Sequence, residues 1–513
     1  MGAPARGDMH AASTARLIEG LTDAKVITLA EDCGGECQAS VSKALTSRGC
    51  SSIAVLPTLR MVTAVCAKTA GEAAETVNAE TAKIPGVLDV EDDSLVTGTK
   101  VDEEDREGDP IIPITDGNGK PYFWGLDRIN QYQLPLDMNI QTQCYPKKGD
   151  GVEVFVVDSG CMVNHPEFSG VKIRSMALES SPYDPAGIDD RGHGSHVAGT
   201  VAGARTGVAP GSSVTCIKVL NDRGRGKSSD VAAGFEYVAA YKAANPGAKV
   251  IMQASLGGSG NHHNTVMRRM AGVGVIGSVA AGNDGGDACD HTPAGSPDVI
   301  TAGNMDIDDS VWRSSNIGRC VDVFAPGHKI LSVDIEGTLT TKTGTSMAAP
   351  HVSGIIALIL ANHPNGASLD VNAVKALLTA GAPMITDHPL AWASPSCNGS
   401  APAPPAPMPG MPAPMPGMPA PMPGMPTPVP GPKGPGPAPV PMPNPGAPAP
   451  VDPPCQMPVP APGAPAPAPG APAPAPGVPA PAPGAPAPAP APVMYPGGIP
   501  PEGSPELPQM PPQ

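Results

Sequence analysis

The sequence predicts a central α/β domain with a mostly parallel sheet and helices on both of its faces. The apolar runs of this region are short and rich in Val, Ile and Ala. They lack polar alternation, which is typical of parallel strands buried on both faces. Segments with apolar residues at helical spacing separate these runs. A small α+β unit precedes this domain, and a Pro-rich tail predicted to be disordered follows it.

The small unit is predicted over residues 24–97, after an N-terminal extension of residues 1–23. Strand-like and helix-like runs alternate in it in the order βαββαβ. The expected strands cover residues 25–29, 52–56, 61–66 and 87–91, and the expected helices cover residues 39–46 and 70–83.

An acidic run extends from Glu91 to Asp109. Such a run is typical of a solvated, flexible linker, because like charges repel one another and little apolar surface is present to bury. We therefore place a linker over residues 98–118.

The α/β domain is predicted over residues 119–395, and its roughly 270 residues suffice for one large core. The expected strands cover residues 152–158, 214–220, 249–256, 273–280, 299–302 and 321–324. The expected helices cover residues 193–204, 230–244, 345–361 and 369–380.

The tail, residues 396–513, repeats Ala, Pro, Met and Gly and holds most of the 69 prolines. Proline removes backbone donors and fixes φ, so we expect an extended, polyproline-like spacer. A methionine-rich binding surface is the alternative interpretation.

Composition narrows the classes of partner and compartment. The net charge of −16 without a basic cluster argues against a nucleic-acid partner. The sequence contains no run of about 18 apolar residues, so it predicts no membrane span. Eleven cysteines without a CxxC pattern favour an oxidising compartment. Residues 1–30 nevertheless lack the apolar segment of a signal peptide.

Three motifs carry groups suited to nucleophilic catalysis. An apolar strand ends in VVDSG with a carboxylate at Asp158, a helix opens within GHGSHVAG with an imidazole at His193, and a second helix opens within GTSMAAPH with a hydroxyl at Ser346. A serine hydroxyl is a weak nucleophile until a base takes its proton. The order Asp, His, Ser is the order found in subtilisin.

These blocks resemble the subtilisin-type serine proteases (subtilases, peptidase family S8), and their details are most similar to the proteinase K branch. The resemblance implies that Ser346 attacks the peptide carbonyl, that His193 acts as general base and then general acid, and that Asp158 orients the imidazole. It also implies that residues 24–97 are an inhibitor I9-type propeptide. Trp124-Gly125-Leu126-Asp127 is similar to the start of the mature enzymes.

The resemblance assigns further site residues. Asn283, within AAGNDG, is similar to the side chain that binds the oxyanion in this family, and the Ser346 N–H is the second donor. Two segments are expected to bind the substrate, and their small residues imply a wide pocket with apolar or aromatic P1 preference. Their residues are Ser255, Leu256, Gly257, Ala280, Ala281 and Gly282. Gln253 and Ala254 replace the usual Asn-Met of the family.

The resemblance also implies stabilising features. Cys289 and Cys320 match a disulfide of bacterial relatives, and the backbone carbonyls of Pro297 and Val299 with the carboxylate of Asp322 match a structural Ca²⁺ site. No cofactor is required for the chemistry. Asp190 and Asp222 stand where many relatives carry another cysteine pair. Cys161 and Cys216 are a candidate pair, as are members of Cys33, Cys37, Cys50 and Cys66 in the small unit, and the sequence leaves both connectivities open.

A self-cleaving zymogen follows from the family, with the cut between about Val96 and Lys120. The expected partners are protein and peptide substrates, the chain's own propeptide as inhibitor, and a cell-wall or matrix partner of the tail. We expect a monomer in the secretory pathway or outside the cell.

Two alternative interpretations fit the sequence less well. A zinc site at His193 and His196 lacks a third ligand and the Glu general base of metalloproteases. A catalytically dead scaffold, in which the tail is the functional part, disagrees with the presence of all three catalytic residues and Asn283.

Overall fold

The computed structural model describes residues 24–66, 74–98, 115, 122–140, 145–259 and 262–393. The predicted N-terminal extension, the Pro-rich tail and nearly all of the predicted linker lie outside these residues.

The small unit has the predicted βαββαβ order. Its strands form an antiparallel sheet in the order β2-β3-β1-β4, and Gly49 (φ 82°) provides the turn between its first helix and β2. The elements are β1 (Ala24–Leu29), α2 (Gly35–Ser47), β2 (Cys50–Leu56), β3 (Met61–Cys66), α3 (Ala74–Thr81) and β4 (Val87–Asp92).

The acidic run begins inside the predicted last strand of the small unit, and strand structure continues to Gly98, the first residue of the predicted linker. Glu91 and Asp92 belong to β4, and a further strand, β5 (Leu95–Gly98), follows after two residues. Sequence pattern missed β5 because its hydrogen-bonding partners lie far away in the chain, in strands β9 (Arg225–Lys227) and β11 (Leu256–Ser259).

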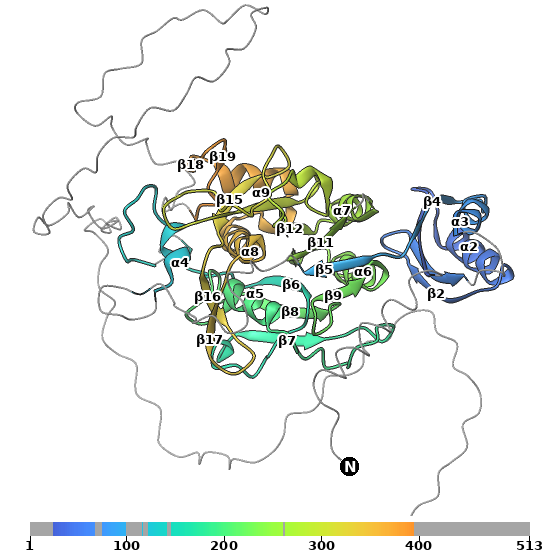
Figure 1. Ribbon diagram of the computed structural model, residues 1–513, viewed down its shortest axis with the longest axis horizontal. Coiled ribbons are helices and arrows are strands. Elements are labelled where there is room, and N and C mark those ends of the chain that lie inside the picture. Colours follow the sequence, from blue (N-terminus) through green and yellow to red (C-terminus); the bar gives the residue numbers. More distant parts are fainter. Residues whose placement is uncertain are drawn as a thin grey trace, which may run out of the picture. The chain divides into compact units, whose positions relative to one another are not determined.

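A seven-stranded sheet forms the centre of the second domain (Figure 1). The strands pair in parallel in the order β15-β14-β12-β10-β6-β8-β7. They are β6 (Val152–Asp158), β7 (Lys172–Met176), β8 (Ser213–Lys218), β10 (Lys249–Ala254), β12 (Ile276–Ala280), β14 (Ile300–Met305) and β15 (Val323–Pro326). The edge strand β7 was not predicted, since its side chains are only partly buried.

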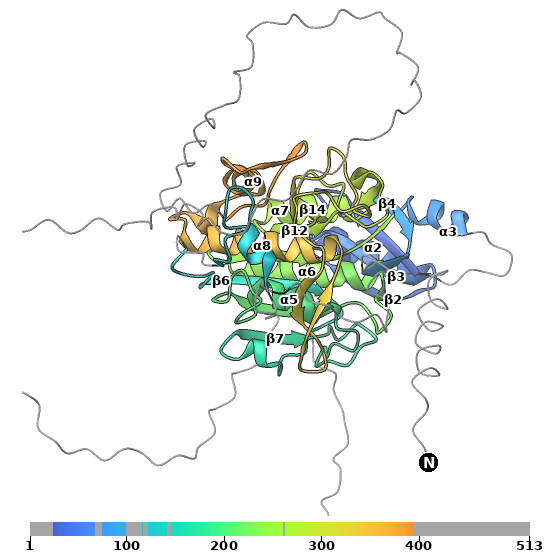
Figure 2. The same cartoon turned by 60° about the vertical axis from the view of Figure 1, so that its left-hand side comes forward.

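Helices cover both faces of this sheet, as the absence of polar alternation predicted. Val154 and Val156 of β6 pack into the core beneath α5 (His193–Ala202) and α8 (Thr345–Asn362). Phe155 and Val157 point to the opposite face, towards α6 (Ser228–Ala244) and α7 (His262–Gly272). Figure 2 shows α5 and α8 side by side. The other elements are α4 (Trp124–Arg128), α9 (Val371–Thr379), β13 (His291–Thr292), β16 (Ile330–Val333), β17 (Leu339–Lys342), β18 (Met384–Ile385), β19 (His388–Pro389) and the 3₁₀ turns Pro166–Phe168, Ala288–Asp290 and Gly366–Ser368.

Within the described residues, α8 alone is long and apolar enough to cross a membrane, and 94% of that stretch is buried inside the protein. Its apolar character is accounted for by its place in the core.

The parallel sheet fixes where functional groups gather. The carboxyl ends of parallel strands meet at one edge of a sheet, where ligands commonly bind. Strand β6 ends there in Asp158, β10 leads into Ser255, and β12 leads into Asn283.

Candidate active site

Asp158 and His193 form a buried pair. The Nδ1 atom of His193 lies 2.8 Å from Asp158 Oδ1, and the two side chains are 2% and 0% exposed. The Ser159 N–H also donates to Oδ1 (2.7 Å). With the proton on Nδ1, the carboxylate holds the imidazole in the tautomer whose Nε2 accepts a proton. Nε2 makes no hydrogen bond to the part of the chain that the structure describes.

Two glycines allow the Asp and His motifs to approach each other. A Cβ on Gly194 would lie 2.2 Å from the carbonyl oxygen of Gly160. Gly160 itself has a φ of 94°, which L side chains rarely adopt. Glycine is therefore needed at both positions, because a side chain at Gly194 would clash with the backbone and Gly160 has a positive φ.

Ser346 is a buried residue in the first turn of α8. Pro350, four residues later, has no N–H to donate to the Ser346 carbonyl. The hydroxyl of Ser255 donates to that carbonyl instead (2.9 Å), and the Ser346 hydroxyl lies 3.4 Å from the carbonyl oxygen of Ser255. The predicted substrate segment therefore also holds the nucleophile's backbone in place.

Gln253, one of the departures from the family pattern, extends this contact into α8. Its amide donates to the hydroxyl of Ser255 (2.8 Å) and accepts from the hydroxyl of Ser353 (2.6 Å). Gln253 is fully buried, and its amide connects Ser255 to Ser353 of α8. Sequence reasoning missed this connection.

Asn283 is oriented by the residue before the nucleophile. The Thr345 N–H donates to the side-chain oxygen of Asn283 (2.9 Å), and the Gly282 N–H donates to the hydroxyl of Thr345 (3.1 Å). The carbonyl end of the Asn283 amide therefore faces Thr345. Ala280 and Ala281, expected as pocket walls, are buried just before Asn283.

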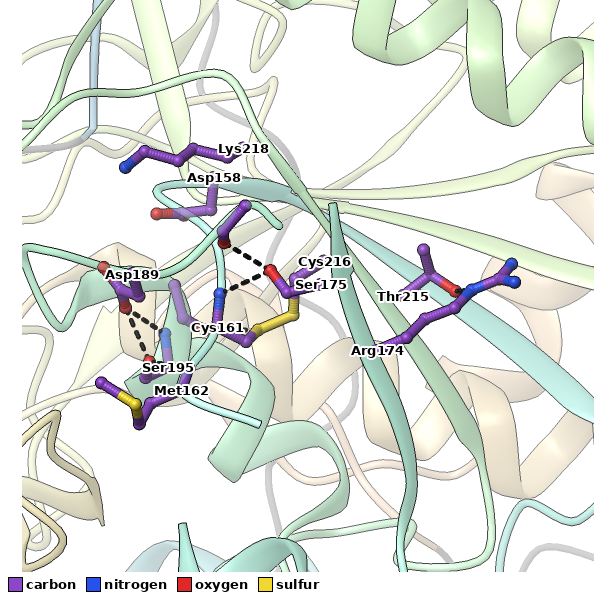
Figure 3. Close-up of a disulfide and its surroundings, with 12 residues drawn as sticks. Asp158, Cys161, Met162, Arg174, Ser175, Asp189, Ser195, Thr215, Cys216 and Lys218 are labelled. Atoms are coloured by element: carbon purple, nitrogen blue, oxygen red, sulfur yellow. Dashed lines mark hydrogen bonds between the residues drawn. A yellow bond between two sulfur atoms is a disulfide. The ribbon is translucent and has the colours of Figure 1, made fainter. Parts of the chain in front are cut away.

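Asp189, which was not among the predicted site residues, connects the segments that carry Asp158 and His193. Its carboxylate is 1% exposed and joins the loop after Asp158 to the first turn of α5, as its contacts with Ser195 show in Figure 3. One oxygen accepts from the Ser159 hydroxyl (2.8 Å) and the Gly192 N–H (2.9 Å). The other accepts from the N–H (2.8 Å) and hydroxyl (2.7 Å) of Ser195. In the sequence, the signal for this residue is an Asp four positions before the His that begins the helix.

We expect Asp189→Asn to lower kcat of the processed enzyme about 10- to 100-fold with little change in KM. An amide cannot accept on both sides, so one set of N–H and O–H donors loses its partner and the His193 turn shifts. Steady-state kinetics measure the split between kcat and KM.

Glu167→Gln is the matched control for Asp189→Asn. Glu167 is also a buried carboxylate that accepts backbone N–H groups, from Arg205 (2.8 Å) and Thr206 (3.3 Å), just after the other end of α5. The control should lower the melting temperature and leave kcat unchanged. Equal kcat losses in both variants would refute the positioning role.

Four disulfides lie in the described residues. They settle the pairings that the sequence left open and include the pair expected from the resemblance: Cys33–Cys37, Cys50–Cys66, Cys161–Cys216 and Cys289–Cys320. Cys161–Cys216 fastens the loop after Asp158 to β8 (Figure 3).

A lysine that forms an ion pair also contacts the loop after Asp158. Lys218, 4% exposed, donates to the carbonyl oxygen of Ser159 (2.9 Å) and to the carboxylate of Asp190 (2.7 Å). Asp190, one of the two acids expected at the position of a cysteine pair, thus forms an ion pair with Lys218.

His196 is a packing residue. It is fully buried with Nε2 2.9 Å from the carbonyl oxygen of Ile330, and burial holds its pKa well below the usual value. The described part of the chain contains no cluster of three or more His, Cys, Asp or Glu side chains suited to a metal ion.

Lys375 contacts two of the three expected calcium ligands. Lys375 Nζ lies 2.8 Å from Asp322 Oδ1 and donates to the carbonyl oxygen of Pro297 (3.2 Å). Val299 is buried immediately before β14.

Strand β5 pairs with the predicted substrate segment. Gly98 lies opposite Leu256 and Thr97 opposite Gly257 in β11, while β9 pairs with the other edge of β5. A Cβ on Gly98 would lie 3.9 Å from Cε1 of His193, so β5 ends against the imidazole. Val96 packs among apolar side chains of the second domain.

Carboxylates on both sides fix the small unit to the second domain. Glu236 of α6 accepts from the N–H groups of Thr58 (2.9 Å) and Leu59 (2.8 Å). Asp93 accepts from the N–H (3.0 Å) and hydroxyl (2.5 Å) of Ser229 at the start of α6. Burial is the largest influence on both carboxyls and raises the pKa of each.

The chain is similar to known serine proteases. Alkaline serine exoprotease A of Vibrio alginolyticus is 38% identical over 283 residues, covering 55% of this chain and 51% of the relative. The extracellular serine proteinase of Thermus sp. (strain Rt41A) is 38% identical over 273 residues, covering 52% and 63%. The crystal structure of a cold adapted subtilisin-like serine proteinase is 37% identical, with 53% and 98% covered and a TM-score of 0.48.

The chain thus spans about half to two thirds of the length of these curated relatives. The sequence profile of the subtilase family matches residues 149–399, which hold all three predicted catalytic motifs. Through these residues the chain belongs to the subtilase family.

Proposed function

We propose that this protein is a serine endopeptidase made as a self-cleaving zymogen. The observation that carries the proposal is the position of β5. This strand lies in antiparallel register along β11 and ends at the imidazole of His193, as a peptide substrate would. The buried Asp158–His193 pair supplies the base.

The chemistry follows from the contacts at the site. His193 Nε2 takes the hydroxyl proton of Ser346 as the serine oxygen attacks the peptide carbonyl, and Asp158 stabilises the imidazolium. The amide of Asn283 and the N–H of Ser346 stabilise the oxyanion. His193 then returns the proton to the leaving amine, and water hydrolyses the acyl-enzyme by the same steps. Each role falls on a side chain or backbone group of the chain, so the proposed reaction uses no cofactor.

The substrate class follows from how β5 binds. Backbone pairing with Leu256 and Gly257 accepts any extended peptide, which favours broad specificity. The small residues Ala280, Ala281 and Gly282 favour a wide apolar pocket for an apolar or aromatic P1 side chain.

The register of β5 points to a processing bond. A peptide that keeps this register beyond Gly98 brings its next residue opposite Ser255, whose carbonyl oxygen lies 3.4 Å from the Ser346 hydroxyl. For the chain's own segment that residue is Thr99. We therefore propose cleavage between Thr99 and Lys100, at the N-terminal end of the range expected from sequence. The register of the tethered strand selects this bond, whereas the apolar or aromatic P1 preference is proposed for separate substrates.

After cleavage, the small unit is proposed to remain bound as an inhibitor. The contacts of Glu236 and Asp93 support this, because both carboxylates satisfy backbone donors across the boundary between the two domains. A surface held by buried hydrogen bonds separates more slowly than one held by exposed ion pairs alone.

Export to an oxidising compartment is proposed on the four disulfides, and one relative is named as extracellular. A matrix partner of the tail, the monomeric state and the absence of a nucleic-acid partner stay predictions from sequence.

Digestion of a denatured protein tests the proposed activity. The processed enzyme is expected to cut mainly after apolar and aromatic residues, and a sulfonyl fluoride should stop cleavage by modifying Ser346. Mass spectrometry identifies both the cut sites and the modified residue. Predominant cleavage after Lys or Arg would refute the pocket assignment, and cleavage that resists the reagent would refute the mechanism.

A further inference from the structure

The side chain of Lys375 lies where the family resemblance implied a calcium ion. It reaches from α9 to Asp322, with Nζ 2.8 Å from Oδ1, and donates to the carbonyl oxygen of Pro297 at 3.2 Å. These are two of the three predicted calcium ligands. The other oxygen of Asp322 accepts from the Thr301 N–H (2.9 Å), which fixes the carboxylate beside β14.

The residues present do not fit calcium while the lysine occupies this position. Ca²⁺ takes six to eight oxygen ligands and favours several carboxylates, and Asp322 is the one carboxylate of the predicted set. An ion here would bind the same two oxygens as the ammonium, so two positive groups would compete for one negative charge.

We infer that the ammonium of Lys375 is the resident cation of this site and takes the place of calcium. A lysine ammonium is a compact charge with three donors, and two of them are directed at Pro297 and Asp322. The side chains of Lys375 and Asp322 are only 22% and 26% exposed. The ammonium therefore links α9 to the segment before β14 and to the residue just before β15.

The inference has a direct consequence for how stability depends on solution conditions. Stabilisation by a bound ion varies with the concentration of that ion. A cation that is part of the chain is present at any calcium concentration and is not removed by a chelator. The contribution of this site to stability should therefore be independent of calcium in the wild-type sequence.

The test compares melting temperatures in chelator and in millimolar CaCl₂. All proteins carry Ser346→Ala in the full chain, so that self-digestion does not interfere. The variants are Lys375→Met, Lys375→Arg, Asp322→Asn and the double variant Lys375→Met/Asp322→Asn. Lys172→Met is the matched control, because Lys172 pairs with Asp150 (3.2 Å) at an exposed site elsewhere.

Asp322→Asn should leave the response of the melting temperature to calcium unchanged from that of the parent. Lys375→Met should melt about 2–4 °C lower in chelator and gain a calcium response that the double variant lacks. Lys375→Arg keeps the charge and should gain none. The inference is overturned if Asp322→Asn alone removes a calcium response from the parent, or if Lys375→Met behaves like Lys172→Met.

Discussion

Full-length protein carrying Ser346→Ala is expected to stay uncleaved, while the wild type shortens to a form that begins at Lys100. The substitution removes the only atom proposed to attack the peptide carbonyl, and loss of the nucleophile costs about 10⁶-fold in kcat in subtilisin. Intact mass and N-terminal sequencing of the two proteins, expressed side by side in an oxidising buffer, measure the outcome.

Ser278→Ala is the matched control for this experiment. Ser278 is also a buried serine that contacts α8, since its hydroxyl donates to the carbonyl oxygen of Ala349 (3.1 Å), but it has no proposed chemical role. This variant should be processed like the wild type. If Ser346→Ala acquires the same new N-terminus, another protease makes the cut. If the wild type starts at a residue other than Lys100, the register argument is wrong while the catalytic assignment survives.

The second large effect is expected for Asp158→Asn, which should slow processing and lower kcat about 10⁴-fold. The carboxylate can only accept, so it selects the tautomer of His193 that carries its proton on Nδ1. An amide can donate to Nδ1, which moves the ring proton to Nε2 and removes the base from Ser346. The rate of appearance of the processed form measures this loss, followed by kcat on a peptide substrate.

Asp190→Asn provides the comparison on the same loop. Asp190 binds Lys218 and is half exposed, and it does not contact His193. Its replacement should change the processing rate by less than about tenfold, since the Asp190 side of the pair is half exposed and Lys218 keeps its hydrogen bond to the carbonyl oxygen of Ser159. Circular dichroism should show both variants folded. A wild-type processing rate in Asp158→Asn would mean that another group orients the imidazole.

Much of the site was predictable because each catalytic motif carries its own local structure. The apolar run that ends in Asp158 predicts a buried strand from its own residues. The glycines at 160 and 194 indicate a close approach of two backbone segments. Ser346 could be placed at a helix start from its flanking glycine and its apolar repeat. Burial on both faces also predicted the central strands, because no polar alternation interrupts them.

The features that the sequence did not predict share one physical cause: each depends on interaction partners that are distant in the chain. Strand β5 is short and polar in part, and only its pairing with β9 and β11 makes it a strand. Asp189 looks like any loop acid until its donors from Ser159 and Ser195 are brought around it. The ammonium of Lys375 reaches Pro297 across 78 positions of sequence.

By itself, the sequence determined the class of fold and predicted which groups carry the chemistry. Periodicity, glycine placement and residue type act within a few residues, so they can be followed along the chain. The tertiary structure alone decided which cysteines pair, which strand lies along β11 at the imidazole, and which cation binds Asp322. Those outcomes depend on distances between atoms of remote segments, and such distances exist only once the sheet and helices have packed.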